Sequence, residues 1–349
     1  MFGRTDDGAL KPGDVVEVRA PAEILATLDA DGSLDGMPFM PEMVPYSGRR
    51  FTVSRRVEKI CDTVKTGGPP QSRRMRDTVL LEDLRCDGSG HDGCQAGCRL
   101  YWKEAWLRRV NPSAEPESRT GDGVAQLEQL TRDGARVVRE VDGSSAELYR
   151  CQATEASRAS EPLGNYDLRQ YVRELTSGNV GPGHFLRVAV RGLSVTIRRR
   201  LRLLGYQPTK GLRDRVRRRL EPLGAKPLPS HGIPAPAKGE LNLQPGEMVQ
   251  VRSPREIAPS IDESGKTRGL SFDWEMLPYC AGRYRVKDRV ERIIDEQTGK
   301  MIEIGSDCLI LDGVTCSGER SQGHWFCPRA IYPYWREAWL RRVEDVDSS

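Results

Sequence analysis

The sequence predicts a mainly β protein in which two copies of one small unit flank a helical middle segment. Two stretches, 12–62 and 245–295, align without a gap at a constant offset of 233, and 23 of their 51 positions are identical. Short runs in both stretches alternate apolar and polar residues, as half-buried strands do. With 37% hydrophobic residues, 30% charged residues, 35 Gly and 23 Pro, the composition suits small domains rich in loops.

The repeat continues to a shared C-terminal motif, since "YWKEAWLRRV" at 101–110 returns as "YWREAWLRRV" at 334–343 with the same offset. We name 12–110 unit 1 and 245–343 unit 2. A chain of 349 residues has room for two or three domains. The expected organisation is an extension (1–11), unit 1, a flexible linker (111–144), a helical basic segment (145–222), a Pro-rich linker (223–244), unit 2 and a tail (344–349).

Each unit begins with a predicted strand, "DVVEVRA" in unit 1 and "EMVQVRS" in unit 2. A long loop interrupted by Gly and Pro residues follows, with a short helix expected at 21–28 and at 254–261. "RRFTVSRRVEKI" and "GRYRVKDRVERI" predict long strands, and "DTVLLEDLRC" and "DCLILDGVTC" predict the next ones. One helical turn with two Trp residues beside it precedes the last short strand, "LRRV".

Five short strands, a long first loop and a turn before the last strand resemble the SH3-like barrel. The duplicated unit also resembles a bacterial family of tandem SH3-like barrel repeats for which no activity is established. The resemblance therefore implies two small β-barrels joined by linkers and helices, and it implies no function.

Large aromatic side chains that recur in both units are expected to fill the small cores. An aromatic groove for extended peptides is the alternative, with the core favoured for the Trp pairs and the two interpretations equally weighted for the Tyr pair. Glu42 and Glu275 are the repeated carboxylates of the long loop, and we expect them to cap loop backbone rather than to act as catalytic acids. The candidate groove consists of Tyr46, Tyr279, Glu42, Glu275, Trp102 and Trp335.

A cysteine-rich loop, "CDGSGHDGCQAGC" at 86–98, is the main candidate for chemistry. Unit 2 carries "CSGERSQGHWFC" at 316–327, so Cys, His and Cys recur while the residues between them change. This pattern indicates a metal site, because zinc takes about four N or S ligands in a tetrahedron. The expected ligands are Cys86, His91, Cys94 and Cys98 in unit 1, and Cys316, His324 and Cys327 in unit 2.

The two copies differ in the fourth ligand. Unit 2 has Ile331 in the place of Cys98, so Cys280 or Cys308 would have to complete its site. A closed site would be a structural zinc clip for a unit with a small core. A site with an open coordination position on zinc or iron would instead permit catalysis. Two further alternatives to the zinc clip are an iron–sulfur site and free thiols that bind no metal. Cys61 is expected in the core, and Cys151 has no partner by spacing.

The middle of the chain is polar at first and then strongly basic, with twelve Lys or Arg and one Asp between 187 and 219. A short helix is expected around 124–130 within the linker, and further helices are expected at 146–159, at 165–179, from 184 to 204 and at 212–220. The third helix would place aliphatic residues on one face and arginines opposite. Three interpretations stay open: packing within the protein, contact with an anionic membrane surface, and binding of nucleic acid. The contact candidates are Arg187, Arg191, Arg198, Arg199 and Arg202.

Signals for enzymatic chemistry are weak, because the sequence has no P-loop, no GxSxG and no HExxH motif. Without a signal peptide or an apolar run that could span a bilayer, a cytoplasmic location is expected, peripheral to the membrane if the basic helix binds lipid. Clustered thiols there bind metals more often than they form disulfides. We therefore expect a non-enzymatic interaction or adaptor protein that binds a protein or peptide partner. The alternatives are a metal-dependent enzyme with an open coordination position in one repeat and a nucleic-acid-binding protein, and the oligomeric state stays open.

Overall fold

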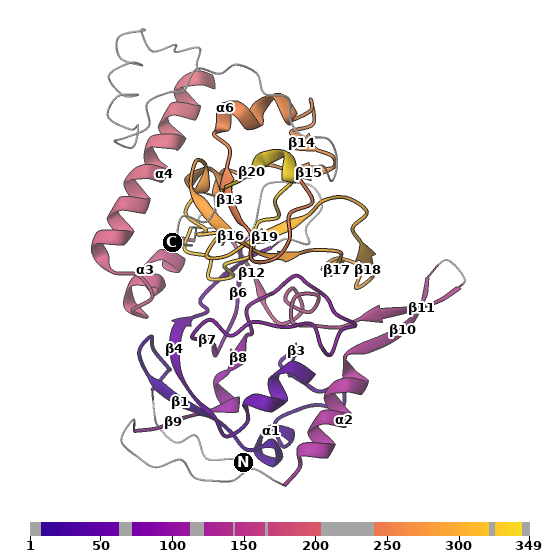
Figure 1. Cartoon of the computed structure of the whole chain (residues 1–349). Helices are drawn as coiled ribbons and strands as arrows, with labels where there is room; N and C mark the ends of the chain where they lie inside the picture. Colours follow the sequence, from indigo (N-terminus) through magenta and orange to yellow (C-terminus); the bar gives the residue numbers. More distant parts are fainter. Residues whose placement is uncertain are drawn as a thin grey trace, which may run out of the picture.

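The computed structural model is a mainly β protein with many small antiparallel sheets and few helices (Figure 1). None of the sheets that the described residues form closes into a barrel. Each unit has a main sheet of its own, and the middle segment contacts both units. The structure describes residues 8–62, 72–111, 122–141, 144–164, 167–203, 241–320 and 325–343.

Unit 1 consists of one open antiparallel sheet with short helical turns around it. Its elements are β1 (Val15–Val18), α1 (Pro21–Leu25), β2 (Ser33–Leu34), β3 (Met37–Pro38), η1 (Pro41–Tyr46), β4 (Arg50–Arg56), β5 (Ile60–Cys61), β6 (Ser72–Arg74), β7 (Thr78–Leu81), β8 (Trp102–Lys103), η2 (Glu104–Trp106) and β9 (Leu107–Arg109). The strand order in the sheet is β8-β7-β4-β1-β9. Val16 and Val18 of the inner strand β1 are fully buried, which accounts for the alternation in "DVVEVRA".

Unit 2 repeats four of these five strands, so the duplication in sequence is also a duplication of structure. Its elements are β13 (Met248–Val251), α6 (Pro254–Ile257), η3 (Ala258–Ser260), β14 (Lys266–Thr267), β15 (Leu270–Ser271), η4 (Trp274–Tyr279), β16 (Arg283–Arg289), β17 (Arg292–Ile294), β18 (Met301–Glu303), β19 (Leu309–Leu311), η5 (Glu337–Trp339) and β20 (Leu340–Arg342). The strand order is β19-β16-β13-β20. Even the irregularity in pairing recurs, between Val53 and Arg55 of β4 and between Val286 and Asp288 of β16.

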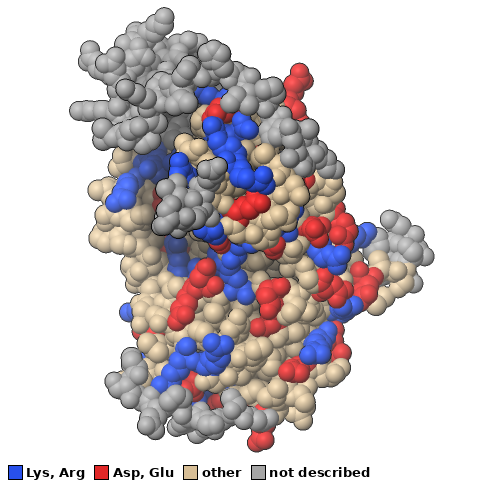
Figure 2. All heavy atoms as spheres, in the orientation of Figure 1, with Lys and Arg blue, Asp and Glu red and all other residues tan. Residues whose placement is uncertain are grey.

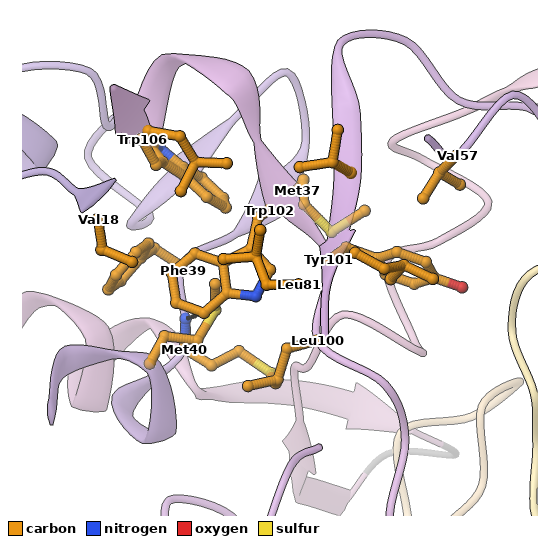
Figure 3. Close-up of a cluster of buried hydrophobic side chains, with 14 of the residues drawn as sticks. Val18, Met37, Phe39, Met40, Val57, Leu81, Leu100, Tyr101, Trp102 and Trp106 are labelled. Atoms are coloured by element: carbon orange, nitrogen blue, oxygen red, sulfur yellow. Dashed lines mark hydrogen bonds between the residues drawn. The ribbon is translucent and has the colours of Figure 1, made fainter. Parts of the chain in front are cut away.

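The core of unit 1 is built around two indole rings (Figure 3). Trp102 and Trp106 are fully buried, and Phe39 meets them edge-on at ring-centroid distances of 6.1 and 5.1 Å. Edge-to-face pairs of this kind add about 0.5–1.5 kcal/mol each to the free energy of burial. The aromatic residues near the end of the unit therefore hold the long first loop against the sheet.

Unit 2 has the same aromatic arrangement, in which Phe272 meets Trp335 and Trp339 edge-on at 6.3 and 5.3 Å. Trp335 and Trp339 are fully buried. Trp102 and Trp335 were also groove candidates, and their complete burial agrees with the core interpretation favoured for the Trp pairs. The physical reason is that a small sheet needs large side chains to exclude water from its buried face.

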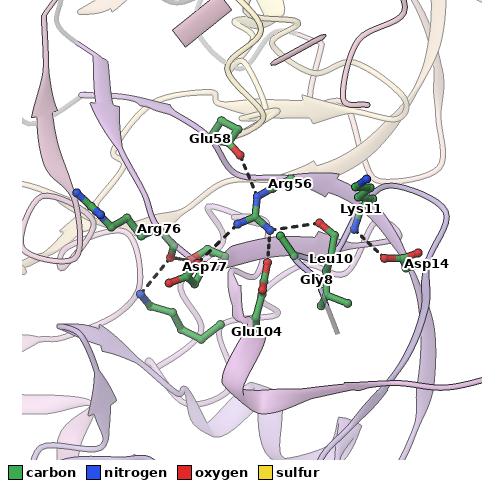
Figure 4. Close-up of polar contacts among 12 residues, drawn as sticks. Gly8, Leu10, Lys11, Asp14, Arg56, Glu58, Arg76, Asp77 and Glu104 are labelled. Carbon is green, nitrogen blue, oxygen red and sulfur yellow. Dashed lines mark hydrogen bonds and ion pairs between the residues drawn. The ribbon is translucent and has the colours of Figure 1, made fainter. Parts of the chain in front are cut away.

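A polar network ties the N-terminal segment of unit 1 to its last helical turn (Figure 4). The guanidinium of Arg56 donates a hydrogen bond to the Leu10 carbonyl oxygen at 3.2 Å and forms ion pairs with Glu58 and Glu104. Because these groups are largely shielded from water, each hydrogen bond and charge needs its partner.

The same network recurs in unit 2. Arg289 donates to the Leu243 carbonyl oxygen at 2.5 Å and pairs with Glu337 at 3.0 Å. The Glu337 carboxylate is fully buried and also accepts the backbone N–H of Leu243 at 2.9 Å. The repeated "WREAWL" and "WKEAWL" motifs therefore encode a polar contact as well as an aromatic core.

The middle segment is more regular than the sequence predicts. Within the expected linker, α2 confirms the short helix expected around 124–130, β10 is an additional element, and the helix expected at 146–159 is strand β11 followed by turns. β10 and β11 form a hairpin, so cross-strand pairing outweighs the local helical preference of "AELYR". The elements are α2 (Val124–Gly134), β10 (Arg136–Val141), β11 (Ser144–Tyr149), β12 (Glu161–Leu163), α3 (Arg169–Thr176) and α4 (Pro182–Leu203).

Helices α3 and α4 confirm two of the predicted helices, and α4 runs along one flank of unit 2 (Figure 1). In α4, Val188 is buried and the Phe185 ring stacks on Phe326 of unit 2 at 5.4 Å. The helix predicted at 212–220 lies outside the described residues. Among the described helices, none combines the length and the apolar character that a membrane crossing requires.

Candidate metal centre

Three potential ligands, two of them buried and Cys86 half-buried, meet beneath the cysteine loop of unit 1. Glu42 comes from η1, and Cys86 and His91 come from the loop that follows β7. The Glu42 Oε1 atom lies 2.6 Å from His91 Nδ1 and 3.4 Å from Cys86 Sγ. In the described part of the chain, this is the only group of three His, Cys, Asp or Glu residues whose ligand atoms all lie within 4.8 Å of one another.

The loop folds back on itself through backbone hydrogen bonds. The Cys86 N–H donates to the Cys98 carbonyl oxygen at 2.8 Å, and the Cys94 N–H donates to the His91 carbonyl oxygen at 3.1 Å. Gly88 has a φ of +75°, and a Cβ at this position would collide with the Cys94 backbone. Only glycine fits such a turn. Gly88 is therefore required for the turn that brings the loop back toward Cys86.

The carboxylate and the imidazole of this group form a buried ion pair. Burial alone would raise the pKa of Glu42, but the hydrogen bond and charge of His91 outweigh it and lower that pKa. Burial would likewise lower the pKa of His91, but Glu42 raises it above the ordinary value. The second ring nitrogen, Nε2, lies 3.2 Å from the Arg150 carbonyl oxygen. His91 would therefore have to release a proton before its Nδ1 could ligate a metal.

A cavity of about 40 Å³ lies beside this group, and four cysteines line it: Cys86, Cys94, Cys98 and Cys151. Cys151 follows β11 in the middle segment, and the sequence alone offered no partner for it. Burial raises the pKa of Cys98 to about 12 and that of Cys151 to about 11. These thiols are neutral without a metal, and a bound cation would displace their protons.

Unit 2 contributes to the wall of the same cavity through Ile294. The backbone N–H of Ile294 donates a hydrogen bond to Cys94 Sγ at 3.3 Å. The equivalent contact from unit 1 to unit 2 also exists, since the N–H of Cys61 in unit 1 donates to Cys327 Sγ in unit 2 at 3.2 Å. Cys61 and Ile294 occupy the same place in the repeat, so the cysteine loop of each unit rests on the equivalent strand of the other unit.

In the described part of the unit 2 cysteine loop, the Cys316 N–H donates to the Ile331 carbonyl oxygen at 2.8 Å, as the Cys86 N–H does to Cys98 in unit 1. Burial raises the pKa of Cys316 to about 12. A hydrogen bond from the Cys61 thiol lowers the pKa of Cys327 to about 7, although burial opposes that shift. Cys61, expected in a core, thus lies against the cysteine loop of unit 2, and His324 lies outside the described residues.

The structure does not bring the predicted fourth ligands of unit 2 to this loop. Cys280 packs against the main core of unit 2, and Cys308 lies in a separate cluster with Val290 and Tyr332. Cys280 directly follows η4 and Cys308 directly precedes β19, and both thiols pack among apolar neighbours there. The thiol beside Cys327 is instead Cys61 of unit 1, which no spacing within unit 2 could reveal.

The remaining groove candidates are half-buried or hydrogen-bonded. Tyr46 meets Trp102 edge-on at 6.0 Å, and the Tyr279 hydroxyl donates to the Thr315 carbonyl oxygen at 2.6 Å. Among the described residues, the aromatic side chain most open to solvent is one that the sequence reasoning missed. Trp274 is 73% exposed at the start of η4, where unit 1 has Pro41.

The basic helix α4 presents a different face from the expected one. Leu186 and Val190, two members of the predicted apolar stripe, are 64% and 60% exposed, while Gly192 packs against Trp325. Arg191 pairs with Glu319 at 3.3 Å. Acidic and basic side chains are interspersed over the surface in Figure 2. Arg187 is exposed, and the side chains of Arg198, Arg199 and Arg202 lie outside the described ones.

No protein-family model, no curated protein and no solved structure matches this chain. The geometry of the cysteine loops therefore carries the functional argument.

Proposed function

We propose that the chain is a non-enzymatic interaction protein in which a metal centre stabilises two SH3-like units and keeps them in contact. The observation that carries this proposal is the largely buried group of Glu42, Cys86 and His91, whose ligand atoms lie within 4.8 Å of one another. A metal bound there would fix the cysteine loop of unit 1, a segment with little regular structure of its own.

The unequal hydrogen bonding of the two Glu42 carboxylate oxygens supports a bound metal at this site. Oε1 accepts hydrogen bonds from the loop, whereas Oε2 is buried and has no partner among the described residues. A buried polar atom without a partner costs on the order of 1–3 kcal/mol, and a metal cation would offset that cost. In unit 2 both oxygens of Glu275 accept hydrogen bonds, from Ser317 Oγ at 2.7 Å and from the Arg320 N–H at 2.6 Å.

The donor set indicates which metals fit. A carboxylate, a thiolate and an imidazole together suit zinc, which commonly serves as a structural clip. Iron is the alternative, and an iron–sulfur cluster would draw on the other cysteines of the cavity. Either metal would join residues far apart in the chain, since Glu42 and Cys86 belong to different elements.

Elemental analysis of the full chain, purified without chelators or oxygen, tests this function. We expect a stoichiometric thiophilic metal, and we expect Cys86→Ser to lose it together with several degrees of thermal stability. Cys280→Ser is the matched control, because this thiol packs on the unit 2 core away from the loops. Metal-free wild-type protein, equally stable before and after treatment with a chelator, would contradict the proposal.

We further propose the outward face of α4 as the contact surface for a partner or an anionic membrane. Leu186 and Val190 are exposed there, and Arg187 lies beside them in the helix. Exposed aliphatic side chains next to arginines are typical of helices that lie in the membrane interface. The metal-dependent enzyme and the nucleic-acid-binding protein remain predictions.

Sedimentation with vesicles containing phosphatidylserine tests the contact surface. The wild-type chain is expected to sediment with them, and the double variant Leu186→Glu, Val190→Glu is expected to remain in solution. The control is Leu168→Glu, Val172→Glu, which changes two residues of the α3 region that are 71% and 58% exposed. Equal sedimentation of all three proteins would contradict the α4 face as the membrane contact. If the wild-type chain does not bind the vesicles, the proposed contact of this face is with a protein partner.

A further inference from the structure

A pair of thiols joins the two units at the cysteine loop of unit 2. Cys61 ends β5 of unit 1, and Cys327 lies in the unit 2 loop, 266 residues further along the chain. The N–H of Cys61 donates to Cys327 Sγ at 3.2 Å, and the Cys61 thiol donates a second hydrogen bond to the same sulfur. Two thiols in hydrogen-bonding contact are near the separation of about 2 Å that a disulfide requires, so a small side-chain movement brings them together.

Backbone donors and positive charges surround the Cys327 sulfur. Besides the N–H of Cys61, the N–H of Arg329 donates to it. The Arg329 guanidinium lies 3.4 Å from the Cys61 carbonyl oxygen and is paired with Glu296 at 2.6 Å. The buried ammonium of Lys59 interacts electrostatically with the same sulfur. Such surroundings favour the thiolate, which is the nucleophilic form of cysteine.

The described residues build no metal group around this pair, since their one group of three ligand atoms within 4.8 Å of one another lies beneath the unit 1 loop. At the equivalent contact in the other direction, Cys94 Sγ accepts the N–H of Ile294 at 3.3 Å, and the side chain of Ile294 carries no thiol. The pairing of Cys61 with Cys327 is therefore particular to the unit 2 loop.

We propose that Cys61 and Cys327 are a peroxide-reactive thiol pair that forms a disulfide between the two units. The Cys327 thiolate attacks one oxygen of hydrogen peroxide, the O–O bond breaks, and Cys327 becomes a sulfenic acid while the other oxygen leaves as water after taking a proton. The Cys61 sulfur then attacks the Cys327 sulfur, the S–O bond breaks, and the oxygen leaves as a second water with the proton of Cys61. The two thiols lose two electrons and two protons, and one peroxide is reduced to two waters.

The disulfide would lock the contact between the units. It would close a loop of 266 residues in the unfolded chain, and a cross-link over a long loop restricts the unfolded state strongly. A dithiol reductant would reopen the contact by thiol–disulfide exchange. The inference does not rest on the proposed metal centre, because neither cysteine belongs to the group beneath the unit 1 loop.

The experiment treats the full chain with hydrogen peroxide, blocks the remaining thiols with iodoacetamide and digests the protein with trypsin. The expected tryptic peptides 60–65 and 321–329 each contain one cysteine. We expect mass spectrometry to find these two peptides linked, and dithiothreitol to separate them. The oxidised chain should melt several degrees above the reduced chain. A wild-type chain in which peroxide leaves Cys327 unlinked, or links it to a cysteine other than Cys61, would overturn the proposal.

Two single variants divide the reaction into its steps. Cys61→Ser should stop at the sulfenic acid, which dimedone traps on Cys327. Cys308→Ser is the matched control, because this buried thiol of unit 2 lies in a separate cluster, and it should form the link as the wild type does. Absence of the dimedone adduct from Cys327 in Cys61→Ser would overturn the first step. A metal ion that is lost in Cys61→Ser but kept in Cys86→Ser would assign the pair as metal ligands and overturn the proposal.

Ile294→Cys gives a test that does not depend on the folding of Cys61→Ser. This variant places a thiol at the equivalent contact with Cys94 in unit 1. We expect peroxide to form a second link between the units, which joins peptides 86–99 and 293–300 through Cys94. Absence of this second link would overturn the argument that the shared backbone contact brings the two positions within bonding reach.

Discussion

Unit 1 and unit 2 share a sheet, a core and a polar network, yet their cysteine loops have different surroundings. In unit 1 the loop meets Cys151 of the middle segment and encloses a cavity lined by four thiols. In unit 2 the loop meets Cys61 of unit 1, and Glu275 has its hydrogen bonds satisfied within the loop. The residues that both copies share therefore build the scaffold, whereas residues that differ between the copies, such as Cys61, or that lie outside both, such as Cys151, decide what surrounds each loop.

The contact between the units is reciprocal. Each loop sulfur accepts a backbone N–H from the equivalent strand of the other unit, at 3.3 Å for Cys94 and 3.2 Å for Cys327. The donor residue is Ile294 in one direction and Cys61 in the other. One side chain at this position therefore decides whether a further thiol reaches the loop.

The largest expected effect concerns the shared core. Trp102→Ala and Trp335→Ala should each lower the free energy of unfolding by about 3–5 kcal/mol, because both indoles are fully buried. Urea denaturation followed by circular dichroism measures this. Trp274→Ala, at a position 73% exposed, is the control and should change stability by less than about 0.5 kcal/mol. A large loss in only one unit would contradict the equivalence of the two cores.

A smaller effect separates the two polar networks. Glu337 is fully buried, whereas the Glu104 side chain is 22% exposed. Removing the partner of a buried charge costs about 3 kcal/mol, and partial solvation reduces the cost. We expect Glu337→Ala to destabilise the chain by about 3 kcal/mol and Glu104→Ala by about 1 kcal/mol. Equal losses in urea denaturation would indicate that solvent does not reach Arg56.

The smallest effect is the pH dependence of the metal-free protein. The pKa of His91 is raised above 6.5, so the stability from its protonated form is present below pH 6.5 and is lost as the pH rises through the folded value. The pKa of Glu42 is lowered below 4.5, so its contribution is present above pH 4.5 and is lost as the pH falls through the folded value. The melting temperature of the chelator-treated wild type should be highest between pH 4.5 and pH 6.5. In His91→Gln the melting temperature should fall less as the pH rises above this range. An unchanged profile in His91→Gln would contradict the ion pair.

Much of the scaffold was predictable because its signals are local. The alternation in "DVVEVRA" places Val16 and Val18 in the core, and the turn "EAWL" places Trp106 there as well. The helix expected at 146–159 was wrong because β10 supplies a pairing partner, which local propensity does not register. Cys280 and Cys308 were predicted as the fourth ligand because only residues of unit 2 were considered. The thiol beside Cys327 is instead that of Cys61, which belongs to unit 1.

The sequence alone was enough to predict the duplication, the succession of the main strands along the chain, the burial of the tryptophans and the recurrence of Cys, His and Cys in two loops. Only the tertiary structure decided that Cys151 and Cys61 join those loops and that Glu42 lies beneath His91. The physical reason is distance. A strand or a turn is encoded by neighbours in the chain, but a metal site requires donors that converge within a few ångströms in space, and segments far apart in the chain carry no spacing that reveals their meeting.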